Sequence, residues 1–202
     1  MSPRPLVFAT RNHGKLVELR QLLPDLDVLD IAQAAARLGR EIPEVVEDAD
    51  TFVGNAAKKA REVSAVTGLP ALADDSGLCV DALGGDPGVY TANWAETPTG
   101  RDWNLAMRKV EDALAARGPE AGRDAHFVCV LSLCWPDGHV ESFEGRVDGT
   151  LAWPPRGTIG FGYDPVFVPL GHDQTFAELP PETKHRISHR AVAFAKLVAA
   201  VF

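Results

Sequence analysis

The stretch LPALADDSGLCVDALGG, residues 69–85, ends an apolar run in two adjacent carboxylates, Asp74 and Asp75, which a Ser-Gly pair follows. This pattern predicts a strand over residues 69–73 that leads into the two acids and then into a tight turn. Neighbouring like charges repel one another unless a positive group lies against them. The sequence therefore predicts a cation beside this pair of aspartates.

Outward from this stretch, strand and helix patterns alternate along the chain. The predicted elements are a strand at 5–9, a polar loop at 10–14, helices at 15–23, 51–67 and 101–117, strands at 126–135 and 139–147, an irregular loop at 153–165 and a closing helix marked by Ile187, Ala191, Phe194, Val198 and Val201. The turn Pro-Asp-Gly at 136–138 joins the last two strands as an antiparallel hairpin. Together these elements predict an α/β fold with a mixed sheet.

Length and composition restrict the class of protein. A chain of 202 residues suits one domain, or one domain with a small lobe. A net charge of -8 argues against a basic surface that follows DNA or RNA, but a small anionic substrate needs only a local basic pocket. Three cysteines without framework spacing predict reduced thiols in a cytosolic protein, with Cys129 and Cys134 in the core. The first residues carry no long apolar segment, so we expect neither a signal peptide nor a membrane span.

The first candidate site is the loop between the opening strand and the first helix. Its residues are Thr10, Arg11, Asn12, His13, Gly14 and Lys15. A helix N-terminus presents unpaired backbone N–H groups and a positive dipole end, which favour phosphate. Thr10 and Asn12 can donate hydrogen bonds, while Arg11 and Lys15 supply positive charge. A basic surface loop without a ligand explains the same residues equally well.

The second candidate is a set of acids around the quoted stretch. Its members are Glu44, Glu47, Asp48, Asp50, Asp74 and Asp75. Mg²⁺ typically takes one or two carboxylates and fills its other positions with water and substrate phosphates. Successive side chains of an extended backbone point to opposite sides, so at most one of the paired aspartates contacts a metal directly. A solvated surface explains Glu44, Asp48 and Asp50 best, which leaves Asp75 and Glu47 as the principal ligand candidates.

Two further stretches carry aromatic and basic residues. In GFGYDP, residues 160–165, an aromatic side chain flanked by glycines can stack on a base, whereas the missing helix excludes a dinucleotide-binding turn. The stretch KHRISHR, residues 184–190, offers Lys184, His189 and Arg190 beside the closing helix, although a solvated helix start explains them too. His185 and His189 stand four residues apart, but the sequence lacks the HExxH motif and zinc is not expected.

Seven motifs then occur in a fixed order along nearly the whole chain. They are ATRN at 9–12 with Lys15 and Glu18, TF at 51–52 with Asn55 and Lys59, ADDSGL at 73–78, GG at 84–85, PGVY at 87–90, GFGYDP at 160–165 with Phe167, and SHR at 188–190 after Lys184. In this combination and order the chain resembles the inosine/xanthosine triphosphate pyrophosphatase family, also called ITPases.

The resemblance implies both an architecture and an activity. The implied fold is a single catalytic domain over residues 1–202, an elongated mixed sheet flanked by helices, with two lobes, a cleft between them and usually a homodimeric state. The implied reaction is Mg²⁺-dependent hydrolysis of ITP, dITP and XTP to the monophosphate and pyrophosphate, which cleanses the cytoplasmic nucleotide pool. Two alternatives stay open: a related pyrophosphatase for other modified nucleotides, and a nucleotide-binding module with reduced turnover. Neither a nucleic acid polymer nor a membrane is an expected partner.

The resemblance also implies roles for individual residues. Asp75 would accept the proton of the attacking water and hold the metal, assisted by Glu47 and Asp74, so that the predicted cation is Mg²⁺. The implied substrate contacts are Thr10, Arg11, Asn12, His13, Gly14 and Lys15 for the triphosphate, Ser76, then Phe161, Gly162, Tyr163 and Asp164 around the base, with Lys184, His189 and Arg190. Two positions depart from the family: Gly54 replaces a common Glu, and Asn93 replaces a common Arg.

Overall fold

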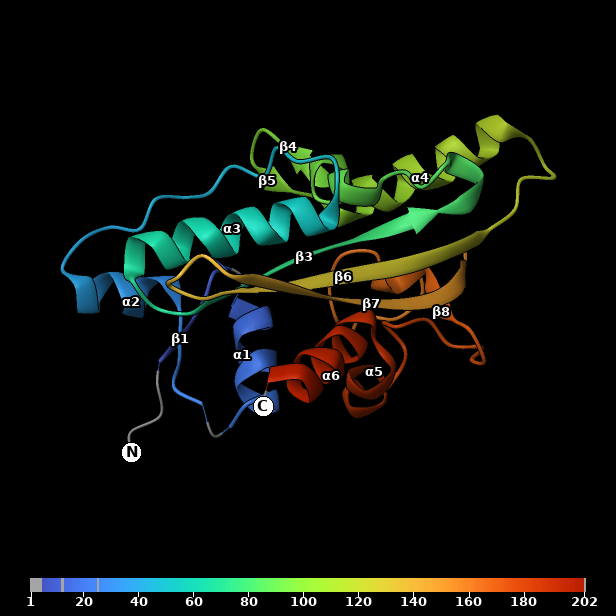
Figure 1. Ribbon diagram of the computed structural model, residues 1–202. Coiled ribbons are helices and arrows are strands. Elements are labelled where there is room, and N and C mark those ends of the chain that lie inside the picture. Colours follow the sequence, from blue (N-terminus) through green and yellow to red (C-terminus); the bar gives the residue numbers. More distant parts are fainter. Residues whose placement is uncertain (1–4, 12, 25, 202) are drawn as a thin grey trace. The chain divides into compact units, whose positions relative to one another are not determined.

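The computed structural model, which describes residues 5–11, 13–24 and 26–201, contains a six-stranded sheet with helices packed against it (Figure 1). The strands lie in the order β2-β1-β3-β6-β7-β8. Their bounds are β1 Leu6–Phe8, β2 Val28–Leu29, β3 Ala71–Val80, β6 Asp124–Cys134, β7 Val140–Leu151 and β8 Phe167–Pro169. Strand β1 runs parallel to β2 and β3, whereas β7 and β8 are antiparallel. The predicted α/β fold with a mixed sheet is therefore confirmed.

Six α-helices lie in the described part of the chain. They are α1 His13–Leu22, α2 Ile31–Leu38, α3 Phe52–Thr67, α4 Trp103–Arg117, α5 Pro181–Ile187 and α6 His189–Val201; a short ladder of β4 Glu96–Thr97 and β5 Gly100–Arg101 precedes α4. The predicted bounds of α3 are confirmed, because Thr51 accepts a hydrogen bond from Gly54 N at 3.1 Å and Gly68 ends the helix with φ 68°. The stretch Trp153 to Pro165 is irregular up to a 3-10 turn, as predicted.

Helix α2 was absent from the predicted elements, although its sequence carries a start and a stop signal. Asp30 accepts a hydrogen bond from Gln33 N at 2.7 Å, and the Gln33 side chain accepts one from Asp30 N at 3.0 Å. This reciprocal capping box fixes the first turn, and Gly39, with φ 64°, ends the helix. The pair Asp30 and Gln33 is the signal that could have identified α2 from the sequence.

The sequence predictions for β3 and for the start of α1 are wrong in detail. Strand β3 does not end at residue 73 but runs through both aspartates to Val80, without the tight turn predicted at Ser76. The reason is that Leu78 and Val80 are fully buried, so the core extends the strand beyond the acids. His13 and Gly14 belong to α1 rather than to the preceding loop.

The closing helix, predicted as continuous, is broken between α5 and α6. Ser188 adopts an extended backbone, φ -68° and ψ 155°, at the end of α5. Its hydroxyl then accepts a hydrogen bond from Ala191 N at 3.2 Å in the first turn of α6. The apolar spacing of residues 187–201 does not reveal this break, because a cap of this kind interrupts the backbone without disturbing the period.

The described chain divides into two compact units. Unit 1 takes in the described residues of Met1–Asp75 and Val130–Phe143, and unit 2 those of Ser76–Cys129 and Glu144–Phe202. Each unit has its own core: Val7, Ala60 and Ala73 contribute to the core of unit 1, and Phe127 and Phe167 to the core of unit 2.

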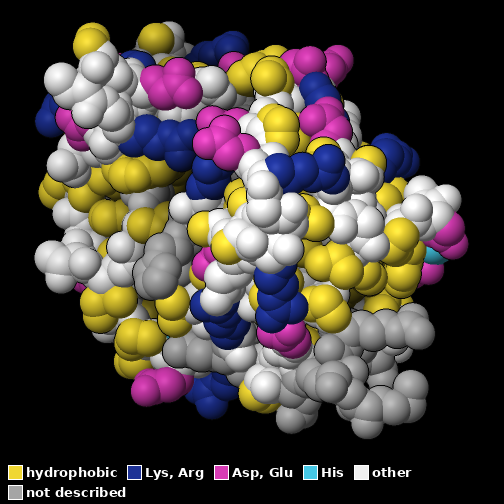
Figure 2. Space-filling model, turned by 90° about the vertical axis from the view of Figure 1, so that its left-hand side faces the viewer, with side chains coloured by type: hydrophobic (Ala, Val, Ile, Leu, Met, Phe, Trp, Pro, Cys, Tyr) yellow, Lys and Arg dark blue, Asp and Glu magenta, His cyan; other side chains and the backbone are white. Residues whose placement is uncertain are grey.

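Charged side chains of both signs lie on the surface, and the cysteines lie inside. Figure 2 shows Lys and Arg side chains interspersed with Asp and Glu side chains on the face that it displays. The three cysteines, Cys79, Cys129 and Cys134, are all buried, as predicted for the last two. Among the described helices, none is both long enough and apolar enough to cross a membrane.

Candidate active site: a lysine–carboxylate cluster and an aromatic loop

Unit 1 brings together side chains from β3, α1 and α3 around the paired aspartates. Lys15 Nζ, from α1, contacts Asp74 Oδ2 at 2.6 Å, and both side chains are largely buried. Asn55 Nδ2, from α3, donates a hydrogen bond to Asp75 Oδ2 at 3.1 Å. Because successive strand residues point to opposite sides, the two carboxylates meet different partners. We call Lys15, Glu47, Lys59, Asp74 and Asp75 the carboxylate cluster.

Lys59 is the second positive group of this cluster. Its Nζ donates a hydrogen bond to the backbone oxygen of Asp74 at 2.7 Å and also forms an ion pair with Glu47. Burial alone would lower the pKa of Lys59, but the carboxylates of Asp74, Glu47 and Asp75 raise it above its usual value. Lys59 is therefore held in its charged form. Lys15 and Lys59 both supply the positive charge that was expected beside the paired aspartates.

Burial disfavours the charged form of the Asp75 carboxylate. Burial raises its pKa to about 6, and the neighbouring charges of Glu47 and Asp74 add to this effect, whereas Lys59 and the hydrogen bond from Asn55 oppose it. A further cation would stabilise the ionised form. Among the described residues, no three His, Cys, Asp or Glu side chains form a metal site by themselves. A set of one or two carboxylates nevertheless fits Mg²⁺, which takes its other ligands from water and phosphate.

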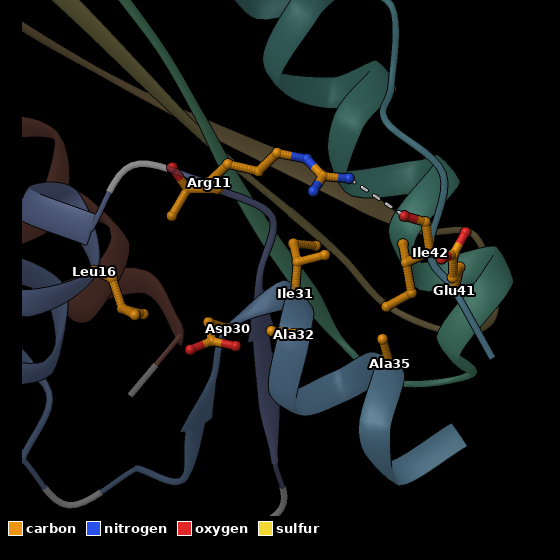
Figure 3. A pocket seen from close by; sticks show the side chains of 9 residues that line it. Arg11, Leu16, Asp30, Ile31, Ala32, Ala35, Glu41 and Ile42 are labelled. Carbon is orange, nitrogen blue, oxygen red and sulfur yellow. Dashed lines mark hydrogen bonds between the residues drawn. The ribbon is translucent and has the colours of Figure 1, made fainter. Parts of the chain in front are cut away.

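The residues predicted to bind the triphosphate lie in two places: Thr10 and Arg11 line a cavity, and Lys15 lies in the carboxylate cluster. Thr10 and Arg11 line a cavity of about 490 Å³, whose other walls are Leu16, Asp30, Ile31, Ala32, Ala35, Glu41 and Ile42 (Figure 3). The Arg11 side chain extends toward residues 41–42, and its Nη2 donates a hydrogen bond to Ile42 O at 3.4 Å. The charged groups that line this cavity are the guanidinium of Arg11 and the carboxylates of Asp30 and Glu41. Lys15 is the residue of this predicted set that the described contacts bring to the carboxylate cluster.

The prediction also named Asn12, His13, Gly14 and Ser76. Asn12 lies outside the described residues, and neither the side chain of His13 nor the burial of Gly14 is described. Helix α1 does begin at His13, so the predicted order of strand, loop and helix start is present. Ser76 follows Asp75 directly in β3 and is half-buried.

Unit 2 holds a second constellation around Phe161. Asp164 is buried, and its Oδ2 accepts a hydrogen bond from Phe161 N at 2.8 Å while forming an ion pair with Lys184. Lys184 Nζ lies 5.2 Å, and Arg190 Cζ 5.8 Å, from the centroid of the Phe161 ring. The ring itself is 47% exposed. The exposed ring can stack on a base, and the two cations can donate hydrogen bonds to that base. We call Phe161, Asp164, Lys184 and Arg190 the aromatic loop site.

The remaining predicted residues of unit 2 support this loop. Tyr163 is 1% exposed; its hydroxyl donates to Thr91 O at 3.3 Å, and burial raises its pKa. The ring of buried His189 stacks on Phe127, with centroids 4.8 Å apart. Gly162 has φ 68° and Gly160 has φ 85°, conformations that glycine adopts without strain. A Cβ atom on Gly160 would lie 2.1 Å from Asp164 Oδ2, so the loop requires glycine there.

Asn55 and Lys59 are the functional residues that residue-level analysis missed. They were noted as motif members but received no role. They stand four residues apart on α3, a spacing that puts both on one face of the helix. Polar side chains on the inner face of an Ala-rich helix were the available signal. Asn93, the second departure from the family pattern, is exposed and lines a shallow hollow with Tyr90, Trp94, Lys109 and Asp112.

The fold and the site place the chain among α/β proteins whose mixed sheet carries a buried pair of carboxylates bonded to lysines. Within that class, the chain belongs to the Ham1 family, whose model matches residues 6–200.

The similarity to individual relatives extends over the whole chain. The chain is 56% identical over 200 residues to a dITP/XTP pyrophosphatase of Zymomonas mobilis, covering 99% of this chain and 93% of that protein. It is 52% identical over 209 residues to a dITP/XTP pyrophosphatase of Agrobacterium fabrum, covering 98% and 96%. Among solved structures, a HAM1 protein from Coxiella burnetii superposes with a TM-score of 0.88 at 37% identity, and 98% of each chain is covered.

Proposed function

We propose that this chain is a dITP/XTP pyrophosphatase, which hydrolyses dITP, XTP and ITP to the monophosphate and pyrophosphate. The observation that carries the proposal is the buried pair of aspartates, Asp74 and Asp75, with the ammonium groups of Lys15 and Lys59 both bonded to Asp74. The relatives with 52% and 56% identity carry that name over matching lengths. Removal of deaminated purine nucleotides cleanses the nucleotide pool.

The carboxylate cluster fits the demands of this reaction. Hydrolysis breaks the anhydride bond between the α- and β-phosphates, and it requires a proton acceptor for water and neutralisation of the phosphate charge. Asp75 is ionised near neutral pH, since its pKa in the metal-free protein is about 6, and it can accept the proton of water. Lys15 and Lys59 bind phosphate oxygens, and backbone N–H groups at the start of α1 add to this binding. Water thus loses its proton to Asp75 while the lysines hold the leaving pyrophosphate.

Mg²⁺ is the proposed cofactor, and Asp75 and Glu47 are the side chains that would hold it. Asp74 is the third candidate; its carboxylate pairs with Lys15, as that of Glu47 pairs with Lys59. When bound, Mg²⁺ neutralises phosphate charge and makes water easier to deprotonate. The raised pKa of Asp75 supports this assignment, since a cation at that carboxylate lowers the cost of its charge.

The aromatic loop site is proposed to select the base. Hypoxanthine and xanthine present a keto oxygen at C6 and an N1–H, whereas adenine presents an amino group and an unprotonated N1. Lys184 and Arg190 supply donors for the keto oxygen, and Phe161 supplies a face for stacking. A pocket built for one pattern leaves buried polar groups unpaired with the other, and the discrimination can reach about 10⁴-fold.

The direct test is a pyrophosphate-release assay with dITP, XTP, ITP, dGTP and dATP, with and without Mg²⁺. We expect kcat/KM for dITP and XTP to exceed that for dATP by at least about a hundredfold. Comparable turnover of dATP, or release of single phosphate, would contradict the proposal. Faster turnover of another modified nucleotide than of dITP and XTP would favour a related house-cleaning enzyme instead.

Replacement of Phe161 by Ala should raise KM for dITP between about tenfold and a hundredfold, because stacking on an aromatic ring contributes roughly 1–3 kcal/mol per base. The melting temperature should stay unchanged, since the ring is half exposed. Leu170→Ala is the matched control: Leu170 is a large apolar side chain of the same unit and is 82% exposed. Equal KM values for Phe161→Ala and wild type would remove Phe161 from the base site.

We further propose that residues 1–202 act as one catalytic domain. The family model supports a single functional module, because it matches residues 6–200 without interruption. A homodimeric state and a cytoplasmic location are proposed from the family resemblance. Sedimentation equilibrium of the full chain tests the dimer: a monomer mass at micromolar concentration would contradict it.

A further inference from the structure

Asn55 joins the proposed catalytic carboxylate to a loop of unit 1 through both ends of its side-chain amide. Its Nδ2 donates to Asp75 Oδ2 at 3.1 Å, and its Oδ1 accepts from Ala49 N at 2.9 Å. The side chain is 3% exposed. Rotation of the amide by 180° would set an oxygen against the carboxylate and an N–H group against another N–H group. The two partners therefore fix the orientation of Asn55.

Gly54 allows Ala49 to approach closely enough to make this hydrogen bond. A Cβ atom on Gly54 would lie 2.8 Å from Ala49 Cβ and 2.9 Å from Thr51 Oγ1. Both distances are shorter than the van der Waals contacts that Cβ atoms make in proteins. Ala49 Cβ is fixed to its backbone, so the loop itself would have to shift. Gly54 belongs to α3, where glycine is less favourable than alanine by about 1 kcal/mol. The missing side chain thus has a packing function at this position.

We propose that Asn55 is a positioning residue for the reaction, and that Gly54 is the position that keeps it aligned. The inference rests on the proposed function, because it assigns Asp75 as the proton acceptor. Ala49 stands two residues after Glu47, so the amide of Asn55 ties the Asp75 carboxylate to the segment that carries Glu47. The departure from the family pattern at Gly54 is then a local solution for loop packing, and not a lost ligand.

The physical reason is orientation. A carboxylate accepts a proton along its lone-pair directions, and Asp75 turns freely about its terminal bond unless hydrogen bonds hold it. Misplacement of a reacting group by about 1 Å can lower a rate about a hundredfold. The described hydrogen bonds of the Asn55 side chain go to Asp75 and to Ala49. Its loss should therefore act on kcat and leave KM largely unchanged.

The test compares Asn55→Ala, Gly54→Ala, their double variant and Glu62→Ala, an exposed control on the same helix. Steady-state kinetics on dITP and unfolding in denaturant are measured for each. We expect kcat to fall about a hundredfold in Asn55→Ala and about tenfold in Gly54→Ala, with KM within threefold of wild type. The double variant should be no slower than Asn55→Ala, because both changes break the same connection. Glu62→Ala should match wild type.

Independent, multiplicative losses in the double variant would overturn the inference, as would a folded Gly54→Ala with wild-type kcat. The second result decides the question even if Asn55→Ala does not fold. Unfolding free energies of the four variants give a reading that needs no activity, since the two changes should be non-additive in stability too. If wild type releases no pyrophosphate but the two substitutions are non-additive in stability, the proposed function fails, whereas the link from Asp75 through Asn55 to Ala49 stands. If wild type is active and the coupling is absent, the connection fails alone.

Discussion

Asp75→Asn should lower kcat for dITP about a thousandfold while the metal-free variant unfolds at a higher temperature than wild type. The loss of activity follows from removal of the proton acceptor, an effect that typically amounts to about 10²–10⁴-fold. The gain in stability follows from burial: the pKa of Asp75 is about 6 against an ordinary value of 3.8, so the folded protein disfavours the charge. The difference of about two units corresponds to at most about 3 kcal/mol, which the neutral isostere avoids.

The sign of this effect sets its pH dependence. A carboxyl whose folded pKa is raised binds its proton more tightly in the folded state, so ionisation destabilises the fold. The stability difference between Asp75→Asn and wild type should therefore be full above pH 6 and should shrink to zero below about pH 4. Denaturant titrations in EDTA at several pH values measure it.

The control for Asp75→Asn is Glu44→Gln, an exposed carboxylate of the same unit that should change neither activity nor stability. Addition of Mg²⁺ should raise the melting temperature of wild type more than that of Asp75→Asn, which tests the metal assignment without turnover. A variant that retains kcat within tenfold of wild type would show that Asp75 is not the proton acceptor.

Asp164→Asn should lower kcat/KM for dITP at least about a hundredfold, chiefly through KM, and should destabilise unit 2. The Asp164 carboxylate accepts a hydrogen bond from Phe161 N and pairs with Lys184, whose side chain is largely buried. The substitution leaves the ammonium group of Lys184 without its counter-charge, which typically costs about 3–5 kcal/mol at a buried site. Phe161 then loses its defined position over the cations, and substrate binding weakens.

Asp148→Asn is the matched control for this prediction. It breaks the ion pair between Arg146 and Asp148, with an N–O distance of 2.6 Å, in which both side chains are about half exposed. An exposed pair of this kind contributes at most about 1 kcal/mol. Thermal unfolding and steady-state kinetics of both variants give the comparison. Equal, small effects of the two substitutions would mean that Asp164 does not organise the aromatic loop site.

Local sequence signals predicted much of the fold. Helix α3 has the predicted bounds because Thr51 and Gly68 cap it through contacts within a few residues. The inner face of α4 is also as predicted, with Met107 and Val110 buried, since a helical period reports burial directly. Helix α2 escaped prediction although its capping box is equally local, so this omission lies in the interpretation and not in the sequence.

The sequence by itself determined the family, because its motifs need only order and spacing, and it also identified Asp75 and Lys184 as candidates. Tertiary structure decided how the charge of the aspartates is compensated: Lys15 is 59 residues from Asp74 and Asn55 is 20 residues from Asp75. Without knowledge of these partners, the apolar run at residues 69–73 predicts a strand that ends at the two aspartates. Only the fold brings α1 and α3 against β3, and their lysine and amide groups let the strand carry both carboxylates through the core, since buried charge is tolerated where it is paired and hydrogen-bonded.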